Sequence, residues 1–381
     1  MDAHEEISPA VDRRRLFARF WRAASRFWQG RWARVAWSLT VVLVLIVLLQ
    51  LLVQYLLNLW NRHFFDALER RDAAALWKQA QLFVPLAAAS IGLAATSVWG
   101  RMTMQRKWRE SVTRQVIEYW LAKDYFRRLN HLASGSENPE YRISEDVRVA
   151  TDAPVDLVMA LLASVLTAIT FLSVLWSVGG ALTLDAFGRT WTIPGYLVIG
   201  VIVYSSLFSS AMIVVGRQLT AVIEEKNQAE AQFRAAADRL HQDRDSPRAG
   251  PGSKADRRTL WMSVHTVLMR WRSLLWQLAR TTLVSHGNFI LAPVVAWFLC
   301  APKYLAGTMS LGELTQAAAA FVTVQSAFNW LVDNYGRLAD WRSSVNRVAT
   351  LLLALDTLDA LDRIAESKGA APPATGELTE A

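Results

Sequence analysis

The stretch VVLVLIVLLQLLV, residues 41–53, contains one polar side chain, Gln50, and no charged one. It lies inside a longer uncharged segment, residues 35–59. A helix needs about 20 apolar residues to cross roughly 30 Å of hydrocarbon. A helix that is apolar on every side must be buried in protein or in lipid. The segment therefore predicts a transmembrane helix, and the chain is expected to be an integral membrane protein.

Five more segments of the 381-residue chain also lack Asp, Glu, Lys and Arg. We expect each of them to span the membrane: residues 82–100, 157–178, 193–215, 281–299 and 314–332. The last two carry amide and imidazole side chains, which suit helices that pack in a bundle or line a cavity. The predicted fold is thus an all-α membrane protein with six transmembrane helices, residues 35–355.

The positive charges predict the orientation of these spans. Of the 41 Lys and Arg residues, 35 fall in the N-terminal segment 1–34, the two long loops 101–156 and 216–280, and the C-terminal residues 333–381. The positive-inside rule places these segments, and both termini, in the cytoplasm. It also explains the net charge of +8 without nucleic acid. We expect residues 356–381 to form a disordered tail.

The two long loops are predicted to be helical on both sides of a turn. The first turn falls near Asn138-Pro139, and the second at the Pro-, Gly- and Ser-rich residues 246–253. About 25 helical residues on each side would extend roughly 35 Å from the membrane. Short outer loops and two long helical inner loops are the plan of an exporter-type ABC transmembrane domain.

Five collinear sequence elements carry a closer resemblance. They are the NPEYRISED run at residues 138–146, LNLWNRHFFDAL at 57–68, NQAEAQFR at 227–234, APKYLAG with LGELTQ between 301 and 316, and VDNY through Trp341-Arg342 from residue 332. They resemble an ABC transporter group that contains the peroxisomal fatty-acyl transporters and the bacterial SbmA/BacA-related proteins. The group's first element has Asp and Gln where this chain has Glu140 and Tyr141.

The resemblance implies that the first element docks onto an ATPase. The residues matching the group's pattern are Asn138, Pro139, Arg142, Glu145 and Asp146. The group's second inner loop has a Glu-rich segment followed by a Gly pair, whereas residues 242–252 of this chain differ from that pattern. The second docking element is therefore expected to be eroded.

The group's usual chain continues into an ATPase domain after its sixth span. Here a Pro-, Ala-, Thr- and Glu-containing tail follows, and no segment matches the phosphate-binding GxxxxGK[ST] pattern. The nearest approach, residues 250–254, has the wrong spacing and a proline. We therefore expect no catalytic residues, no metal and no cofactor in this chain, and ATP only through a partner ATPase.

The source of energy stays open at this point. The chain is expected to be either the membrane subunit of an ABC transporter with a separate ATPase, or a stand-alone proton-driven transporter like the SbmA/BacA proteins. A non-transporting scaffold is the third alternative. Candidates for a proton relay are His286, Glu224, Glu225 and Glu313, because they lie within or beside the predicted spans.

Predictions about cargo and assembly follow from the resemblance and from helix geometry. Gln325 and Asn329 lie four residues apart on one face and, with His286, are candidates to line a cavity, whereas Gln316 lies on the opposite face. The resemblance implies uptake of peptides or other bulky amphipathic compounds, such as bleomycin or cobalamin-like molecules, across the bacterial inner membrane. Since exporter-type domains work with twelve helices, we expect a homodimer.

Overall fold

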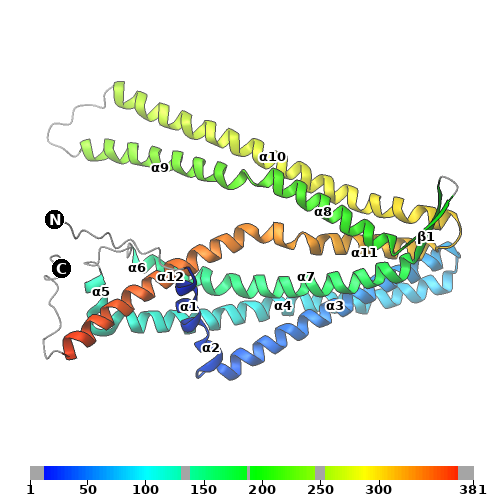
Figure 1. The fold of residues 1–381 in the computed structure, drawn as a ribbon, viewed down its shortest axis with the longest axis horizontal. Helices are drawn as coiled ribbons and strands as arrows, with labels where there is room; N and C mark the ends of the chain where they lie inside the picture. The colour runs from blue at the N-terminus through cyan, green and yellow to red at the C-terminus, as the bar shows by residue number, and fades with distance from the viewer. Residues whose placement is uncertain (1–12, 130–137, 187–188, 245–253, 368–381) are drawn as a thin grey trace. The chain divides into compact units, whose positions relative to one another are not determined.

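The computed structural model describes residues 13–129, 138–186, 189–244 and 254–367 (Figure 1). Most of them are helical. In chain order the elements are α1 (Arg13–Ala24), α2 (Arg26–Gln29), α3 (Ala33–Glu69), α4 (Ala73–Leu121), the 3-10 turn η1 (Ala122–Asp124), α5 (Tyr125–Arg128), α6 (Pro139–Tyr141), the π-turn η3 (Arg142–Asp146), α7 (Val147–Gly179), β1 (Ala181–Ala186), β2 (Arg189–Pro194), α8 (Tyr196–Gly216), α9 (Leu219–Arg244), α10 (Lys254–Leu305), α11 (Leu311–Phe328) and α12 (Trp330–Ser367).

The chain divides into two compact units. Unit 1 comprises Met1–Thr170 and Asp333–Ala381, and unit 2 comprises Phe171–Val332. The helices α7 and α12 pass from one unit into the other. Each unit is described by itself below.

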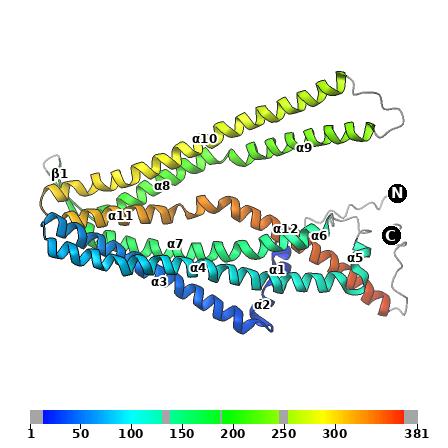
Figure 2. The same ribbon diagram turned by 180° about the vertical axis from the view of Figure 1, so that it is seen from behind.

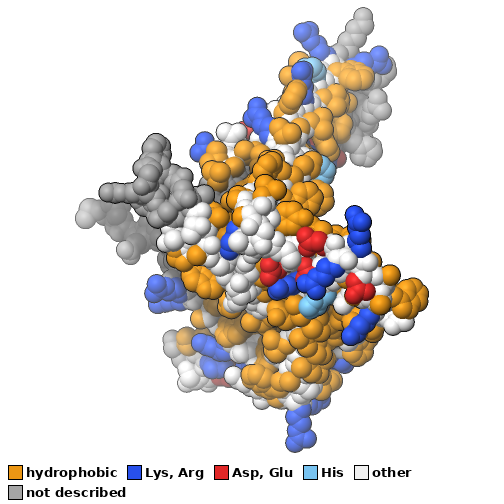
Figure 3. All heavy atoms as spheres, turned by 90° about the vertical axis from the view of Figure 1, so that its right-hand side faces the viewer, with side chains coloured by type: hydrophobic (Ala, Val, Ile, Leu, Met, Phe, Trp, Pro, Cys, Tyr) orange, Lys and Arg blue, Asp and Glu red, His pale blue; other side chains and the backbone are white. Residues whose placement is uncertain are grey.

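Within the described residues, five helical stretches are long and apolar enough to cross a membrane. They are Ala33–Glu69, Ala73–Arg128, Pro139–Gly179, Tyr196–Arg239 and Arg257–Leu305. They contain four of the first five predicted spans in full, and their helical structure is confirmed. The predicted span 193–215 is helical only from Tyr196, because residues 193 and 194 belong to β2. The lengths of 37 to 56 residues exceed the roughly 20 that a bilayer requires. Figure 3 views the molecule from the end at which the hairpin lies, and hydrophobic side chains cover much of this face with charged side chains among them.

The sixth predicted span differs from the expectation. Residues 314–332 do not form one helix, because α11 ends at Phe328 and α12 starts at Trp330, with Asn329 as the cap between them. Nor is α11 among the five apolar candidates. Polar residues such as Gln316 and Gln325 make α11 less apolar than the other five stretches. These two glutamines are buried in protein, as are Ala320 and Phe321. A helix enclosed in this way does not need an apolar surface toward lipid.

The all-α prediction is wrong at one place, because a two-stranded antiparallel hairpin connects α7 and α8. Ala181 pairs with Pro194 at its base, and Ala186 pairs with Arg189 near its tip. Thr and Ile residues are frequent in these strands, and such β-branched side chains favour extended backbone. Gly195 takes a φ of +61°, and a Cβ there would lie 2.4 Å from the Trp176 ring. The site thus requires glycine on steric grounds.

The predicted disordered tail, residues 356–381, is wrong for residues 356–367, which are helical. The helix α12 continues through Ser367 into the predicted disordered tail. Its Asp362 forms an ion pair at 2.8 Å with Arg128 of α5, and Arg128 and Asp362 are 7% and 3% exposed. The Arg128 guanidinium holds the pKa of the Asp362 carboxyl below its usual value. At the other end, α1 and α2 occupy much of the N-terminal basic segment.

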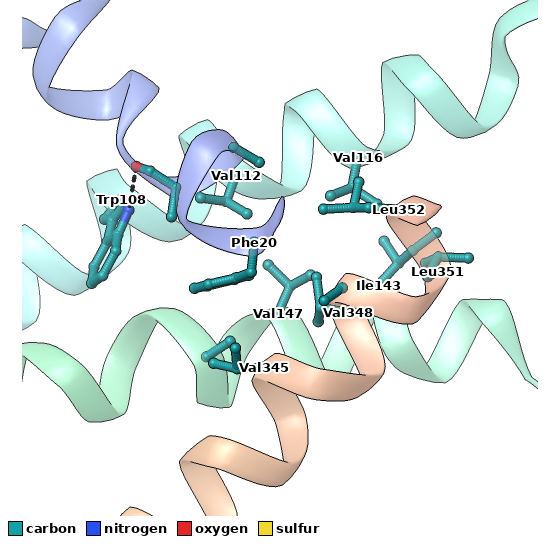
Figure 4. Close-up of a cluster of buried hydrophobic side chains, with 14 of the residues drawn as sticks. Phe20, Trp108, Val112, Val116, Ile143, Val147, Val345, Val348, Leu351 and Leu352 are labelled. Atoms are coloured by element: carbon teal, nitrogen blue, oxygen red, sulfur yellow. Dashed lines mark hydrogen bonds between the residues drawn. The ribbon is translucent and has the colours of Figure 1, made fainter. Parts of the chain in front are cut away.

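A hydrophobic core joins the terminal helices to α4 and α7 inside unit 1. Phe20 of α1 is 1% exposed, and it lies among side chains of α4, α7 and α12 (Figure 4). Trp108 of α4 donates its indole N–H to the Ala24 carbonyl at 3.1 Å. In Figures 1 and 2, α1 runs across the direction of α4. The N-terminal helix is therefore clamped onto the long helices by burial of one face.

Replacing the buried aromatic of α1 should release this clamp. We expect Phe20→Ala to destabilise unit 1 by roughly 3–5 kcal/mol, the usual cost of truncating a buried phenylalanine. Phe17→Ala is the matched control, because Phe17 lies on the same helix and is 45% exposed. Thermal unfolding of the purified protein in detergent measures both. Equal losses from the two variants would contradict this account of the core.

Candidate functional site

A cavity lies among the membrane-spanning helices of unit 1. Its volume is about 390 Å³. It is lined by residues of α3, α4 and the middle of α7, and these helices run alongside one another in both ribbon views (Figure 2). The lining residues are Val47, Gln50, Leu51, Val53, Gln54, Leu57, Ser90, Ala94, Ala163 and Thr167. The lining thus combines aliphatic side chains with amide and hydroxyl groups.

The two amides of this cavity come from the most apolar span of the chain. Gln50 and Gln54 lie four residues apart on α3 and therefore on one face. Ser90 of α4 and Thr167 of α7 add hydroxyls from the neighbouring helices. Polar side chains are costly in hydrocarbon, so those within spans mark water-filled or ligand-contacting positions by default. The amides and hydroxyls can form hydrogen bonds with polar groups of a ligand. The aliphatic side chains of the lining can contact its apolar groups.

A second polar cluster lies inside unit 2, between α8, α10 and α11. The Tyr204 hydroxyl donates to Asn288 Oδ1 at 3.0 Å, and the Tyr204 ring packs against Phe321 at 5.7 Å. Gln325 is one helical turn beyond Phe321 and is 2% exposed. Among the described residues, its Nε2 finds no hydrogen-bond partner. This buried amide is available to water or to a ligand.

The three residues predicted to line a cavity differ in how far they are buried. Gln325 is buried, whereas Asn329 is the partly buried cap at the break between α11 and α12. His286 is exposed on α10, with its ring near Phe289. Gln316 is as deeply buried as Gln325, so protein covers both faces of α11, contrary to the one-face expectation.

The remaining proton-relay candidates lie at helix ends or on surfaces. Glu313 forms a capping box with Ser310 at the start of α11, where a carboxylate complements the helix dipole. Glu224 and Glu225 are exposed on α9. Glu225 forms an ion pair with Arg270 of α10 at 2.7 Å. None of the three lies in the polar cluster formed by Tyr204 and Asn288.

The predicted docking element forms the entry to α7. Asn138 adopts a left-handed conformation with φ of 55°, and Pro139 is the first residue of α6. Asn tolerates this conformation, and proline suits a first helical turn. The π-turn η3 then leads into α7, so the backbone is helical from Pro139 to Gly179. Single π-turns inside α-helices occur frequently at functional sites.

Two carboxylates of this element have opposite environments. Asp146 is 1% exposed and accepts two hydrogen bonds from Arg347 of α12, at 2.6 and 2.8 Å. The structure thus corrects its assignment to a docking surface, because a buried, paired carboxylate positions its own backbone. Glu145 is partly buried and pairs with Arg148, whose guanidinium lowers the pKa of the Glu145 carboxyl. Glu140 and Tyr141 are exposed, so these two side chains are accessible to a partner.

The second predicted docking region cannot be assigned in the same way. Residues 245–253, which include most of the Pro-, Gly- and Ser-rich turn and of the segment nearest to a phosphate-binding loop, lie outside the described residues. Within the described residues, α9 and α10 flank this region and pack against each other. Trp271 of α10 donates to Glu230 of α9 at 3.3 Å, and the Lys226 ammonium lies 5.0 Å from the Trp271 ring. The predicted helix on each side of the turn is confirmed.

Long apolar helices, a polar intramembrane cavity and a helical element at the end of a span define a membrane transport protein. Comparison with known families agrees, since residues 26–305 match the family described as ABC transporter transmembrane region 2. The chain belongs to this family.

Several ABC transporter proteins are similar to the chain over most of its length. The inner membrane ABC transporter ATP-binding protein YddA of Escherichia coli is 24% identical over 90% of this chain and 61% of its own length. An uncharacterized ABC transporter ATP-binding protein of Synechocystis, sll0182, is 24% identical over 86% of this chain and 47% of its own. ABC transporter D family member 2 of Arabidopsis thaliana is 19% identical over 89% and 46%, respectively. The chain thus spans about half to three fifths of these relatives.

Sequence reasoning missed the cavity of unit 1, although a signal was present. Gln50 and Gln54 are four residues apart in a segment that is otherwise aliphatic at nearly every position from 41 to 53. Two amides on one face of such a helix indicate a shared polar environment. Their partners, Ser90 and Thr167, are ordinary small residues, and only packing brings them to the same place.

The cavity can be tested by its access to water. Gln54→Cys should react with a water-soluble maleimide in liposomes at least about tenfold faster than Leu48→Cys, because a thiolate forms poorly in an apolar environment. Leu48 is 45% exposed on the same helix and is not in the cavity lining, which makes it the matched control. The native thiol of Cys300 is fully buried and adds little background. Equal rates would show that water does not enter the cavity.

Proposed function

We propose that this chain is the permease of an ABC-type transporter that carries peptides or other bulky amphipathic compounds inward across the bacterial inner membrane. The observation that carries the proposal is the cavity among α3, α4 and α7. Its volume of about 390 Å³ is within the range of roughly 300–1,000 Å³ typical of sites for drug-sized ligands. The amides and aliphatic side chains of α3, together with the hydroxyls of Ser90 and Thr167, suit an amphipathic cargo.

The proposal includes α11 as a sixth span. Its centre, from Gln316 to Phe321, is largely buried, and α8 and α10 pack beside it. Four consecutive alanines, residues 317–320, allow close approach of neighbouring helices. An interior helix of this kind crosses the bilayer without a strongly apolar sequence. An even number of spans then places both termini on the side richer in Lys and Arg, the cytoplasm.

The proposed energy source is ATP hydrolysis by a separate subunit. The exposed side chains of Glu140 and Tyr141 lie at the entry to α7, where a partner can reach them, and the half-buried Glu145 is beside them. Movement there passes directly into the membrane, because the helix from Pro139 to Gly179 includes Ala163 and Thr167 of the cavity lining. The relatives from Escherichia coli and Synechocystis are longer and are named ATP-binding proteins, which supports ATP as the energy source.

The cargo and the direction rest on the resemblance to SbmA/BacA-related proteins. The five sequence elements that carry it imply uptake of peptides, bleomycin or cobalamin-like molecules. The amphipathic lining of the cavity is compatible with these compounds. We therefore take a labelled antimicrobial peptide as the first substrate to test.

A homodimer is proposed because an apolar stripe on α10 has no neighbour within unit 2. Trp261, Leu268 and Leu275 are spaced by seven residues and are 67%, 59% and 61% exposed. On a helix these positions form one stripe. Arg270, which contacts α9, is about 200° around the helix from Leu268 by the 100° turn per residue. The stripe therefore faces away from α9 and can be covered by a second copy of the chain.

Dependence on ATP is the direct test of the proposed function. Cells that produce the chain together with the ATP-binding protein that co-purifies with it should take up the labelled peptide. Uptake should stop on ATP depletion and persist with a protonophore. The reverse pattern would establish a stand-alone proton-driven transporter, and no uptake under either energy source would favour a scaffold.

Variants of the docking element supply the matched comparison. Glu140→Gln combined with Glu145→Gln removes the charge of one exposed and one half-buried carboxylate and should abolish co-purification of the ATPase while the permease stays folded. Glu224→Gln combined with Glu225→Gln removes the same charge from exposed positions of α9. If both pairs bind the ATPase equally well, the element near Asn138 is not the docking site.

The dimer proposal makes its own prediction. Leu268→Glu places a carboxylate in the apolar stripe and should raise the dimer dissociation constant at least about tenfold, because an unpaired charge is costly to bury. Thr266→Glu is the control, since Thr266 is exposed on the same helix but outside the stripe. Mass measurement in detergent distinguishes the two. A monomeric parent chain would contradict the proposal.

A further inference from the structure

A cavity outside the spans is formed in unit 1 where α1 and α2 meet α4 and α12. Its volume is about 450 Å³. Its lining contains four arginines and two aspartates, together with smaller contributions from uncharged side chains. The charged lining residues are Arg19, Arg22, Arg26, Arg363, Asp356 and Asp359. An adjoining pocket of about 420 Å³ shares most of them and adds Glu118.

Cations and a phenol already satisfy the aspartates. Arg19 donates two hydrogen bonds to Asp356, one of them at 2.8 Å, and the Tyr119 hydroxyl donates a third at 2.9 Å. The hydrogen bond to Asp356 raises the pKa of the Arg19 guanidinium, and burial raises the pKa of Tyr119. Both groups therefore stay protonated. Asp356 is thus a fixed, neutralised part of the cavity wall.

The second aspartate is satisfied in a similar way. Asp359 forms an ion pair with Arg363 at 2.6 Å and accepts a hydrogen bond from Tyr125 at 3.2 Å. The Lys123 ammonium lies 3.9 Å from it. Neither aspartate is left to neutralise a further arginine.

Arg22 and Arg26 supply the excess charge. Both are exposed at the cavity, and within the described part of the chain neither forms an ion pair. The nearby Glu118 lines only the adjoining pocket. Arginine presents its N–H groups in a rigid planar fork that matches phosphate oxygens, and such charge-assisted pairs are the strong ones. From these contacts we infer that the cavity binds a phosphate group, held by Arg22 and Arg26 and bounded by the Arg19–Asp356 pair.

Aromatic side chains of α1 indicate how a lipid could supply that phosphate. Phe17 and Trp21 stack at 6.2 Å and are 45% and 47% exposed. Arg22 follows Trp21 about 100° around the helix. Exposed tryptophan prefers the level of the lipid headgroups, and Trp21 at that level would hold the neighbouring Arg22 close to their phosphates. A soluble phosphate compound reaches the same arginines from water.

Calorimetric titration of the purified full chain in detergent tests the inference and separates the two sources. The probes are dihexanoylphosphatidylglycerol, dihexanoylphosphatidylcholine and inorganic pyrophosphate. Binding of phosphatidylglycerol over phosphatidylcholine identifies a lipid headgroup, and binding of pyrophosphate alone identifies a soluble phosphate. In either case Arg22→Gln with Arg26→Gln should raise the dissociation constant at least about tenfold.

Two further variants separate a built site from general charge. Arg257→Gln with Arg258→Gln removes the same charge from exposed positions of α10 that do not line the cavity, and should leave the dissociation constant within about twofold. Arg22→Lys with Arg26→Lys keeps the charge but loses the fork and should weaken binding several-fold. Unchanged thermal unfolding confirms that each variant is folded. Equal losses in the two Gln pairs, full binding by the Lys pair, or no binding of any probe by the parent chain would overturn the inference.

Discussion

Hydrocarbon offers no hydrogen bonds, and this constraint governs most of the structure. A chain that crosses it must satisfy every backbone N–H and C=O within its own segments, which leaves the α-helix as the solution for a single span. The five long apolar helices follow from that requirement. The only strands within the described residues pair with each other in the short hairpin between α7 and α8. The same constraint makes each polar side chain inside a span informative, because its burial must be compensated.

The intramembrane cavity and the docking element are linked within unit 1 by one helix. About 17 residues of helix, or roughly 25 Å, separate Asp146 from Ala163 in the cavity lining. The pair between Asp146 and Arg347 fixes the start of this helix against α12, and the core around Phe20 fixes α1 on the same group of helices. A partner that moved the exposed residues Glu140 and Tyr141 would therefore act on the helix that carries Ala163 and Thr167 of the cavity lining. This connection gives the proposed permease a physical route between ATP hydrolysis and cargo.

The sequence predicts features that depend on one segment alone, and fails where packing decides. Uncharged runs of about 20 residues reveal the first five spans, and Asn138-Pro139 reveals a helix start. The break at Asn329 and the enclosure of α11 depend on neighbouring helices, so a continuous sixth span was the natural expectation. In the sequence, Asp146 looks like any surface carboxylate. Its burial follows from its pairing with Arg347, which is 201 residues away in the chain. Residues 356–367 are predicted as a disordered tail because their own sequence does not reveal their partners. Those partners lie on α1, α4 and α5.

The central claim is that cargo passes through the cavity formed by α3, α4 and α7. The most direct test is reversible blockage: Gln54→Cys is modified with a bulky methanethiosulfonate reagent in the energised transport assay, and the adduct is then removed with dithiothreitol. The account predicts that transport stops on modification and returns on reduction, while modification of Leu48→Cys has no effect. Transport that continues at the parent rate with residue 54 fully modified would contradict the claim.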